Sequence, residues 1–203
     1  AYYWDGRATP MEAQILGHWQ GQLSLAPLTA IEALAEDPIY IAHFKRSFGS
    51  EPTPDRAVEA LAAFVRTRLS GGSAWDLHEA GEAHAVSEQV VAGARIFNER
   101  AGCATCHTPP LYTDLRYYGV GVRDNEASAD LGRGSADTGP LFKTPGLRGL
   151  RDSGPYFHNG SATTLEEVLA VKEAAGSPRL STAERQQLLL FLESLSPPSD
   201  QQQ

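Results

Sequence analysis

The stretch CATCH, residues 103–107, holds both cysteines of this 203-residue chain, and a histidine directly follows the second one. Three kinds of site use a Cys-x-x-Cys pair: a redox-active dithiol, a zinc site and the attachment point of a c-type haem. Each of them requires different surroundings. The residues around the motif therefore decide what this chain can fold into.

A zinc site would need more ligands than the motif supplies. Structural zinc is bound by four side chains, usually arranged as two closely spaced pairs. No second pair has a short spacing, because His78 and His84 are six residues apart in a Glu-rich stretch. The pattern is a weak match to zinc.

A thioredoxin-like dithiol would need a strand in front of the motif. In such proteins the CxxC pair opens a helix inside a βαβ unit. Here residues 87–99 precede the motif, and their periodicity predicts a helix that Ser87 caps. This context disfavours a redox dithiol.

The sequence C-A-T-C-H matches the attachment motif of haem c. In a helical turn, residues three apart lie on nearly the same side, so Cys103 and Cys106 can each form a thioether to one edge of a porphyrin. His107 is rotated by about 100° from Cys106, which lets its imidazole reach the iron. We therefore predict one covalent haem c on this chain, with His107 as its proximal ligand. Because haem c is attached outside the bacterial cytoplasm, we also predict a periplasmic protein.

The rest of the sequence predicts a mainly α-helical fold without a convincing strand. Helices are expected at residues 29–36 and 39–48, where Pro38 separates the two. Capping signals predict the starts of four more helices, at Thr53, Ser87, Thr164 and Ser181. In the helix after Thr53, one apolar stripe is expected to face the core; it comprises Val58, Leu61, Ala62, Val65 and Leu69.

A long segment, residues 108–163, is rich in glycine and proline and shows little periodicity. Loops above about 15 residues without regular structure are uncommon in compact domains unless they have a function. An ordered loop of this length suits the wall of a pocket for a large flat cofactor. We place a domain boundary in the small-residue joint near residues 70–74, which gives domains at 1–72 and 73–198 and a tail at 199–203.

The composition restricts the partners of the chain. With 41% hydrophobic and 21% charged residues, it is typical of a soluble globular protein. A formal net charge of −8 argues against nucleic acid or an anionic membrane surface as a partner. No apolar run approaches the roughly 20 residues that a membrane-spanning helix needs.

Several longer motifs allow a narrower comparison. The segments YYWDGRATPMEAQ, GARIFNERAGCATCHTPPLYTD and FKTPGLRGLRDSGPYFHNGSATTLEEVL occur in this order. Together they resemble the di-haem cytochrome c peroxidase and MauG family, over essentially the whole chain. The resemblance implies a cytochrome-c-like haem domain with long ordered loops, preceded by the later part of a second, α-helical cytochrome-c-like domain. The sequence lacks the haem motif of that N-terminal domain. Three alternatives stay open: the missing segment lies on another chain, it is a part of the protein outside this sequence, or it does not exist.

The resemblance also implies roles for individual residues. Trp4 matches a tryptophan that relays electrons between the two haems, and Gln14 matches a glutamine of the peroxide pocket. Ser153 and Pro155 match positions whose carbonyl oxygens bind calcium between the domains. Further residues fall in loop motifs near the haem, where the cationic ones are expected to hold the propionates: Asp130, Arg133, Lys143, Arg148 and His158.

Two positions depart from the family pattern. The catalytic glutamate of the family falls on Ser24, which is a poor proton-transfer group near neutral pH. The methionine or tyrosine that supplies the sixth iron ligand falls on Val171, which cannot bind iron. The iron is then expected to be five-coordinate, or bound by water, a neighbouring histidine or Lys172.

The resemblance predicts a peroxidase-like oxidoreductase that acts with peroxide and a small electron-donor protein or a protein substrate. The two departures and the single CxxCH motif keep a second hypothesis open. In that alternative, the chain is a non-catalytic c-type cytochrome subunit that relays electrons in a larger complex.

Overall fold

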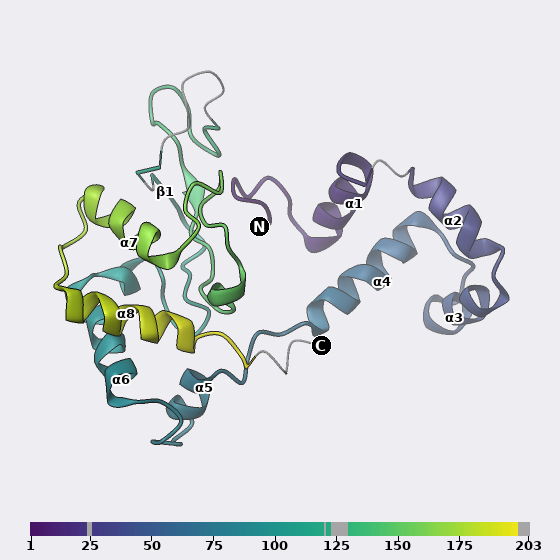
Figure 1. Ribbon diagram of the computed structural model, residues 1–203. Coiled ribbons are helices and arrows are strands. Elements are labelled where there is room, and N and C mark those ends of the chain that lie inside the picture. The colour runs from purple at the N-terminus through teal and green to yellow at the C-terminus, as the bar shows by residue number, and fades with distance from the viewer. Residues whose placement is uncertain (24–25, 120, 123–129, 199–203) are drawn as a thin grey trace. The chain divides into compact units, whose positions relative to one another are not determined.

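The computed structural model describes residues 1–23, 26–119, 121–122 and 130–198. The described chain forms two compact units, Ala1–Leu69 and Ser70–Gln203 (Figure 1). Helices dominate both units. None of the described helices is long and apolar enough to cross a membrane.

The first unit contains four helices: α1 (Met11–Gly21), α2 (Pro27–Ala35), α3 (Pro38–Phe48) and α4 (Pro54–Thr67). The last three begin with proline, which suits the first turn because its missing N–H would have no partner there. The side chains of Asp37 and Thr53 cap α3 and α4. The core of this unit comprises Trp19, Ile31, Phe44, Ala57 and Val58.

The predicted apolar stripe of α4 is only partly buried, which corrects the sequence prediction. Val58 and Ala62 are buried. Leu61 and Val65 are 46% and 42% exposed, and Leu69 lies beyond the end of the helix at Thr67. A helix buries only the residues that neighbouring elements cover, and in this unit α1 and α2 cover only part of the stripe.

The second unit begins with a helix that the sequence analysis missed. Helix α5 (Ala74–Glu79) starts at the predicted joint. Ser73 and Asp76 form a capping box there, so each side chain accepts a hydrogen bond from the backbone N–H of the other residue. The small residues that resemble a flexible joint therefore start a helix.

Three longer helices build the second unit: α6 (Glu88–Arg95), α7 (Leu165–Ala174) and α8 (Thr182–Ser194). The predicted caps are confirmed, because Ser87 caps α6 while Thr164 and Ser181 form capping boxes with Glu167 and Glu184. Helix α6 crosses α8 closely at Gly93. A Cβ atom there would collide with the carbonyl group of Gln187, so the crossing requires glycine.

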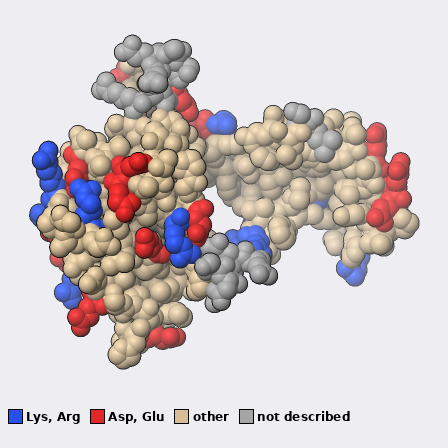
Figure 2. All heavy atoms as spheres, viewed as in Figure 1, with Lys and Arg blue, Asp and Glu red and all other residues tan. Residues whose placement is uncertain are grey.

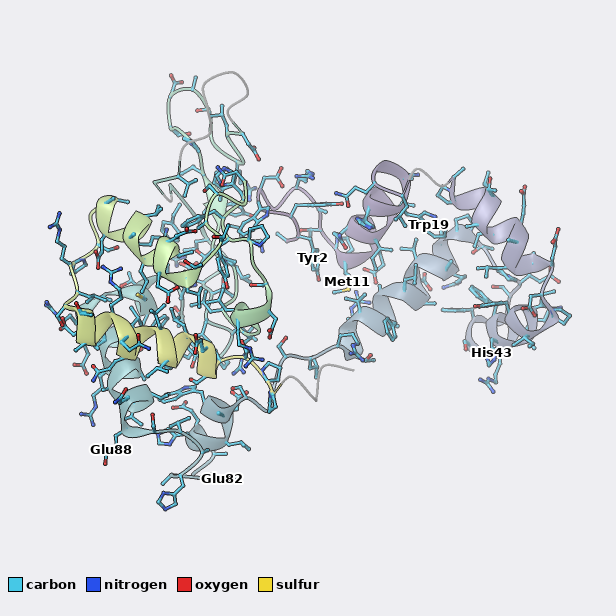
Figure 3. The ribbon with its side chains drawn as sticks, in the orientation of Figure 1. Tyr2, Met11, Trp19, His43, Glu82 and Glu88 are labelled. Carbon is cyan, nitrogen blue, oxygen red and sulfur yellow. The ribbon has the colours of Figure 1, made fainter. Side chains whose placement is uncertain are left out.

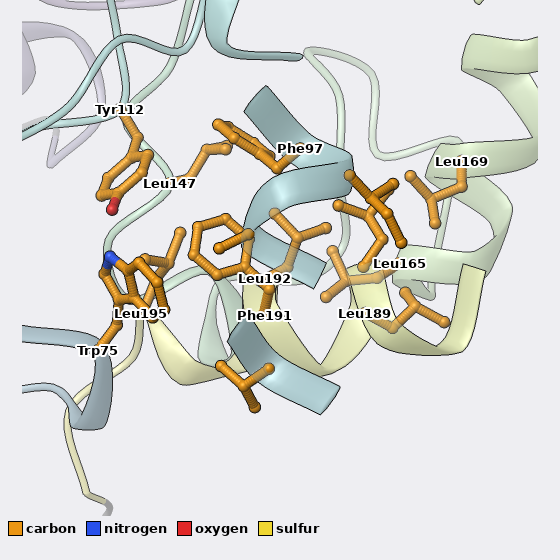
Figure 4. Close-up of a cluster of buried hydrophobic side chains, with 14 residues drawn as sticks. Trp75, Phe97, Tyr112, Leu147, Leu165, Leu169, Leu189, Phe191, Leu192 and Leu195 are labelled. Atoms are coloured by element: carbon orange, nitrogen blue, oxygen red, sulfur yellow. The ribbon is translucent and has the colours of Figure 1, made fainter. Parts of the chain in front are cut away.

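A cluster of apolar and aromatic side chains fills the space between these helices (Figure 4). Phe97 and Phe191 are each 1% exposed, and their ring centroids lie 5.1 Å apart. Leu165 and Leu169 bring α7 into the same cluster. Cys103 packs against its edge, so the core supports the CATCH motif directly.

The described parts of the long segment 108–163 are mostly irregular, as predicted, but they contain a short strand pair. Strands β1 (Tyr117–Tyr118) and β2 (Phe142–Lys143) are antiparallel, with Tyr117 opposite Lys143. The absence of any strand was therefore a wrong prediction. Strands of two residues are too short to show a period-2 pattern in the sequence.

Candidate functional site

The CATCH motif forms a tight turn at the end of a helical segment. Helix α6 continues as a π-helical turn, η1 (Ile96–Arg100), and the motif opens with the 3₁₀ turn η2 (Cys103–Thr105). A 3₁₀ helix has three residues per turn, so the side chains of Cys103 and Cys106 lie on the same side. No disulfide joins them. Two thiols on one side of a turn match the two attachment points of a porphyrin edge.

The ionisation of Cys103 is unlike that of a redox dithiol. Burial raises the pKa of the Cys103 thiol to about 11. Reactive dithiols have the opposite property, because a lowered pKa supplies the nucleophilic thiolate. The buried thiol at Cys103 therefore favours a structural or attachment role over thiol–disulfide exchange.

His107 is oriented for binding a metal through one nitrogen. Its Nδ1 atom lies 2.9 Å from the carbonyl oxygen of Tyr112. A carbonyl only accepts, so Nδ1 carries the proton and donates, which leaves the lone pair on Nε2. Burial also lowers the pKa of His107, which favours the neutral imidazole that metals require. The motif therefore fits haem c, and Nε2 of His107 would be the nitrogen available to bind its iron.

Three of the predicted propionate-binding residues gather around the β1–β2 pair. The guanidinium of Arg133 lies 4.5 Å from the ring centroid of Tyr117, which pairs with Lys143 across the strands. The ring of His158 stacks on Phe142 with a centroid distance of 3.7 Å. Burial lowers the pKa of Lys143. Contact with propionates stays a prediction for all three residues.

Arg148 and Asp130 have other partners in the structure. The guanidinium of Arg148 makes two hydrogen bonds to the carboxylate of Asp76, at 2.7 and 2.8 Å. It also donates to the carbonyl oxygen of Pro110 at 2.7 Å. Asp130 accepts a hydrogen bond from the backbone N–H of Gly132 at 2.8 Å, which shapes the loop. These contacts assign a structural task to both residues, and their role toward haem stays a prediction.

Ser153 and Pro155 lie on the surface directly after the short 3₁₀ helix η3 (Leu150–Asp152). The hydroxyl of Ser153 donates a hydrogen bond to the carbonyl oxygen of Leu150 at 2.9 Å. The predicted calcium ligands are backbone carbonyls, and calcium binding stays a prediction. Within the described ranges, no three His, Cys, Asp or Glu side chains are grouped as in a metal site.

The predicted catalytic residues belong to the first unit. Trp4 is 41% exposed. Gln14 lies on α1, three residues after Met11, which begins this helix (Figure 3). The backbone carbonyl oxygen of Gln14 accepts a hydrogen bond from the hydroxyl of Tyr3 at 3.3 Å. Their roles stay predictions, and Ser24 lies outside the described residues.

Two contacts beside the motif could not be predicted from the sequence. The carbonyl of Tyr112 fixes the imidazole of His107, but a backbone acceptor leaves no signal in a sequence. Tyr118 donates a hydrogen bond to Asp114 at 2.7 Å, and its pKa is raised by this carboxylate and further by Cys106. In the sequence, the Tyr118–Asp114 hydrogen bond corresponds to an Asp-x-x-x-Tyr spacing. This spacing is too common to predict the contact by itself.

Comparisons with known proteins show the family of the chain. Residues 1–84 match the family model described as di-haem cytochrome c peroxidase. The chain is 35% identical to the methylamine utilization protein MauG of Methylorubrum extorquens, over 96% of this chain and 60% of that protein. It is 34% identical to the cytochrome c551 peroxidase of Nitrosomonas europaea, over 83% of this chain and 53% of that protein.

Solved structures support the fold. A MauG-like protein associated with microbial copper homeostasis superimposes with a TM-score of 0.80 at 23% identity, covering 98% of this chain and 72% of that one. The di-haem peroxidase BthA of Burkholderia thailandensis gives a TM-score of 0.74 at 18% identity, covering 97% and 66%.

The chain thus spans a little more than half of the length of these two curated relatives. Its mainly helical, cytochrome-c-like fold agrees with the sequence matches. The chain belongs to the family of di-haem cytochrome c peroxidases and MauG proteins, whose cofactor is haem c.

Proposed function

We propose that this chain is the electron-transferring part of a di-haem, peroxidase-like oxidoreductase that uses peroxide and a protein electron donor. The observation that carries the proposal is the geometry of CATCH, with two thiols on one side of a turn and His107 oriented by Tyr112. The relatives named peroxidase and MauG support the reaction class.

In this proposal the protein holds one haem c in the domain at 73–198. Haem c supplies reversible one-electron chemistry at its iron. Cys103 and Cys106 fix the porphyrin edge through thioethers, and His107 binds the iron through Nε2. The hydrogen bond from Nδ1 to the Tyr112 carbonyl holds the ring in place and increases the basicity of the ligand. Arg133 and Lys143 neutralise the propionates.

The domain at 1–72 would connect this haem to the site that meets peroxide. Trp4 relays electrons and Gln14 faces the peroxide pocket, whose own haem is carried by another segment or a second chain. The carbonyls of Ser153 and Pro155 would hold a calcium ion. We propose a periplasmic location, because haem c is attached there.

The partner of the complex would be a small electron-donor protein or a protein substrate. On the visible face of the second unit, acidic and basic side chains are interspersed (Figure 2). Such a surface suits a transient complex with another protein. In such a complex, complementary charges guide the encounter of the two proteins, and no permanent apolar interface is needed.

A second candidate function is a relay subunit without catalysis. One observation favours it: the 203 residues contain a single CxxCH motif. A chain with one haem can pass electrons inside a larger complex without meeting peroxide itself.

The test uses the complete periplasmic assembly purified from its natural source. Intact mass and a pyridine haemochrome spectrum of this chain should show one haem bound through two thioethers. The assembly should then oxidise a reduced small cytochrome when hydrogen peroxide is added. Haem without any peroxide-dependent turnover would support the relay subunit, and a chain without haem would contradict both functions.

A further inference from the structure

The loop that joins the attachment motif to Tyr112 is exposed along its length. Residues 108–111 are all exposed, and Leu111 has 60% of its surface accessible. An exposed loop takes its geometry from the points at which the rest of the domain holds it. This loop ends at the carbonyl that accepts the hydrogen bond from His107. The points that hold the loop therefore decide how firmly the imidazole is oriented.

The side chain of Tyr112 is the first of these points. It is 3% exposed, and its ring centroid lies 5.9 Å from that of Phe97 and 6.2 Å from that of Phe191 (Figure 4). Its φ angle is 56°, in the left-handed region that a bulky residue rarely adopts. Such backbone persists only where the surroundings enforce it. The buried ring thus holds the backbone in the conformation that brings the carbonyl to His107.

The guanidinium of Arg148 is the second point. Its Nε atom donates a hydrogen bond to the carbonyl oxygen of Pro110 at 2.7 Å, in the middle of the loop. Its central carbon lies 5.8 Å from the ring centroid of Tyr112, within the range of a cation–π contact. An added Cβ atom at Gly146 would lie 3.1 Å from the carbonyl oxygen of Leu111. The segment that carries Arg148 therefore runs directly along the loop.

Arg148 is itself held by Asp76 of helix α5. Its two Nη atoms donate to the carboxylate at 2.7 and 2.8 Å, and its side chain is 16% exposed. Each nitrogen of the guanidinium thus donates to an acceptor of the chain. A planar guanidinium bonded in this way is a rigid anchor. These bonds favour a position behind the proximal histidine over the predicted contact with a propionate.

We propose that Arg148 is a positioning residue for His107. Anchored on Asp76, it locks the loop through Pro110 and Tyr112, so that the Tyr112 carbonyl stays on Nδ1 of the proximal histidine. This inference rests on haem attachment at CATCH, as in the proposed function. The hydrogen bond makes the imidazole a more basic ligand, which stabilises ferric over ferrous iron. A looser loop should therefore raise the reduction potential, whereas the loss of a cation that pairs with a propionate should lower it.

The test is a redox titration of haem-loaded variants. Arg148→Lys keeps the positive charge but loses the planar fork, and its midpoint potential should rise. The double variant Asp76→Asn with Arg148→Gln removes the whole anchor at an unchanged net charge, and its potential should rise further. Tyr112→Phe keeps the buried ring and should retain the potential of the wild type.

A second measurement follows the hydrogen bond itself. In the reduced protein with ¹⁵N-labelled histidine, NMR should show faster exchange of the Nδ1 proton of His107 with solvent in Arg148→Lys than in the wild type. Asp76→Asn retains Arg148 and should also accelerate this exchange, so it replaces Arg148→Lys if that variant does not fold. Circular dichroism reports the fold, and the haemochrome spectrum reports bound haem.

Arg151→Lys is the matched control. Arg151 also donates to a neighbouring carboxylate, that of Asp152, and to a proline carbonyl, that of Pro197, both at 3.0 Å. Neither acceptor belongs to the loop, so this control should change neither the potential nor the proton exchange.

A lower or unchanged potential in folded Arg148→Lys would overturn the inference, and so would an Nδ1 proton that exchanges as slowly in Asp76→Asn as in the wild type. Equal effects of Arg151→Lys and Arg148→Lys would overturn it as well. These outcomes leave haem attachment and the proposed function intact. A wild-type chain without haem would instead contradict the proposed function itself.

Discussion

The guanidinium of Arg148 and the carboxylate of Asp76 face each other through two hydrogen bonds of 2.7 and 2.8 Å. This pair joins the loop after β2 to the first turn of α5. The side chains of Arg148 and Asp76 are only 16% and 25% exposed, so water screens the pair less than it screens a surface ion pair.

We expect the Asp76–Arg148 pair to stabilise the fold in a pH-dependent way. The hydrogen bond from Arg148 is the main cause that lowers the pKa of Asp76 below its usual 3.8. A lowered pKa in the folded state means that the stabilisation is fully present above about pH 4. It is lost as the pH falls through the folded pKa, below 3.8. Urea unfolding at several pH values measures this loss.

Asp76→Asn should cost about 1–2 kcal/mol at pH 7 and should remove this part of the acid sensitivity. Glu184→Gln is a matched control, since Glu184 is also the acid of a capping box and pairs with Arg100. Arg100 is more exposed than Arg148, so this control should lose less stability. Equal losses in the two variants would contradict the expected role of burial.

The two cysteines should be necessary for haem attachment. Cys103→Ser combined with Cys106→Ser removes both thiols, so no thioether can form. The intact mass of this variant, produced with the haem-attachment machinery, should equal that of the polypeptide alone. Covalently bound haem in the double variant would refute attachment at CATCH.

Lys143 should raise the reduction potential of the haem. A positive charge near the propionates favours the reduced iron, because reduction adds one negative charge. Lys143→Met should therefore lower the midpoint potential in a redox titration. Lys45→Met serves as a control, since Lys45 pairs with Glu51 on the surface of the first unit, and it should leave the potential unchanged. A potential unaffected by the loss of Lys143 would place this residue outside the haem environment.

The crossing of α6 and α8 should depend on Gly93. An added Cβ atom would overlap the backbone of Gln187 and approach the Cβ of Phe191. Gly93→Ala should destabilise the second unit by about 1–3 kcal/mol, because the helices would have to separate. Gly71 has no neighbour within 4 Å of an added Cβ, so Gly71→Ala should change stability by less than about 0.5 kcal/mol. Denaturant unfolding of both variants measures these two changes in stability.

Two valines one heptad apart on α4 should differ in their contribution to stability. Val58 is buried, at 5% exposure, and Val65 is 42% exposed. Val58→Ala should cost about 1–3 kcal/mol, since it removes two methyl groups from the core and leaves a cavity. Val65→Ala should cost about 0.5 kcal/mol or less. Equal costs would mean that α4 is covered along its whole length in solution.

Local signals in the sequence predicted the helix starts well. Thr53, Ser87, Thr164 and Ser181 each cap a helix, because a cap depends on residues within one turn of the chain. Helix α5 was missed although its cap is equally local. Ser73 and Asp76 have the spacing of a capping box, but the small residues around Ser73 suggest a joint instead.

The sequence alone identified CATCH as the candidate haem site, since the spacing of two cysteines and a histidine is that of a haem c attachment motif. Tertiary structure decided which distant groups surround that motif. The pairing of Arg148 with Asp76 depends on how segments far apart in the chain pack together, and the carbonyl of Tyr112 meets His107 only because the loop between them folds back. Side-chain spacing encodes contacts within a turn, whereas contacts between elements arise only when the core between them has formed.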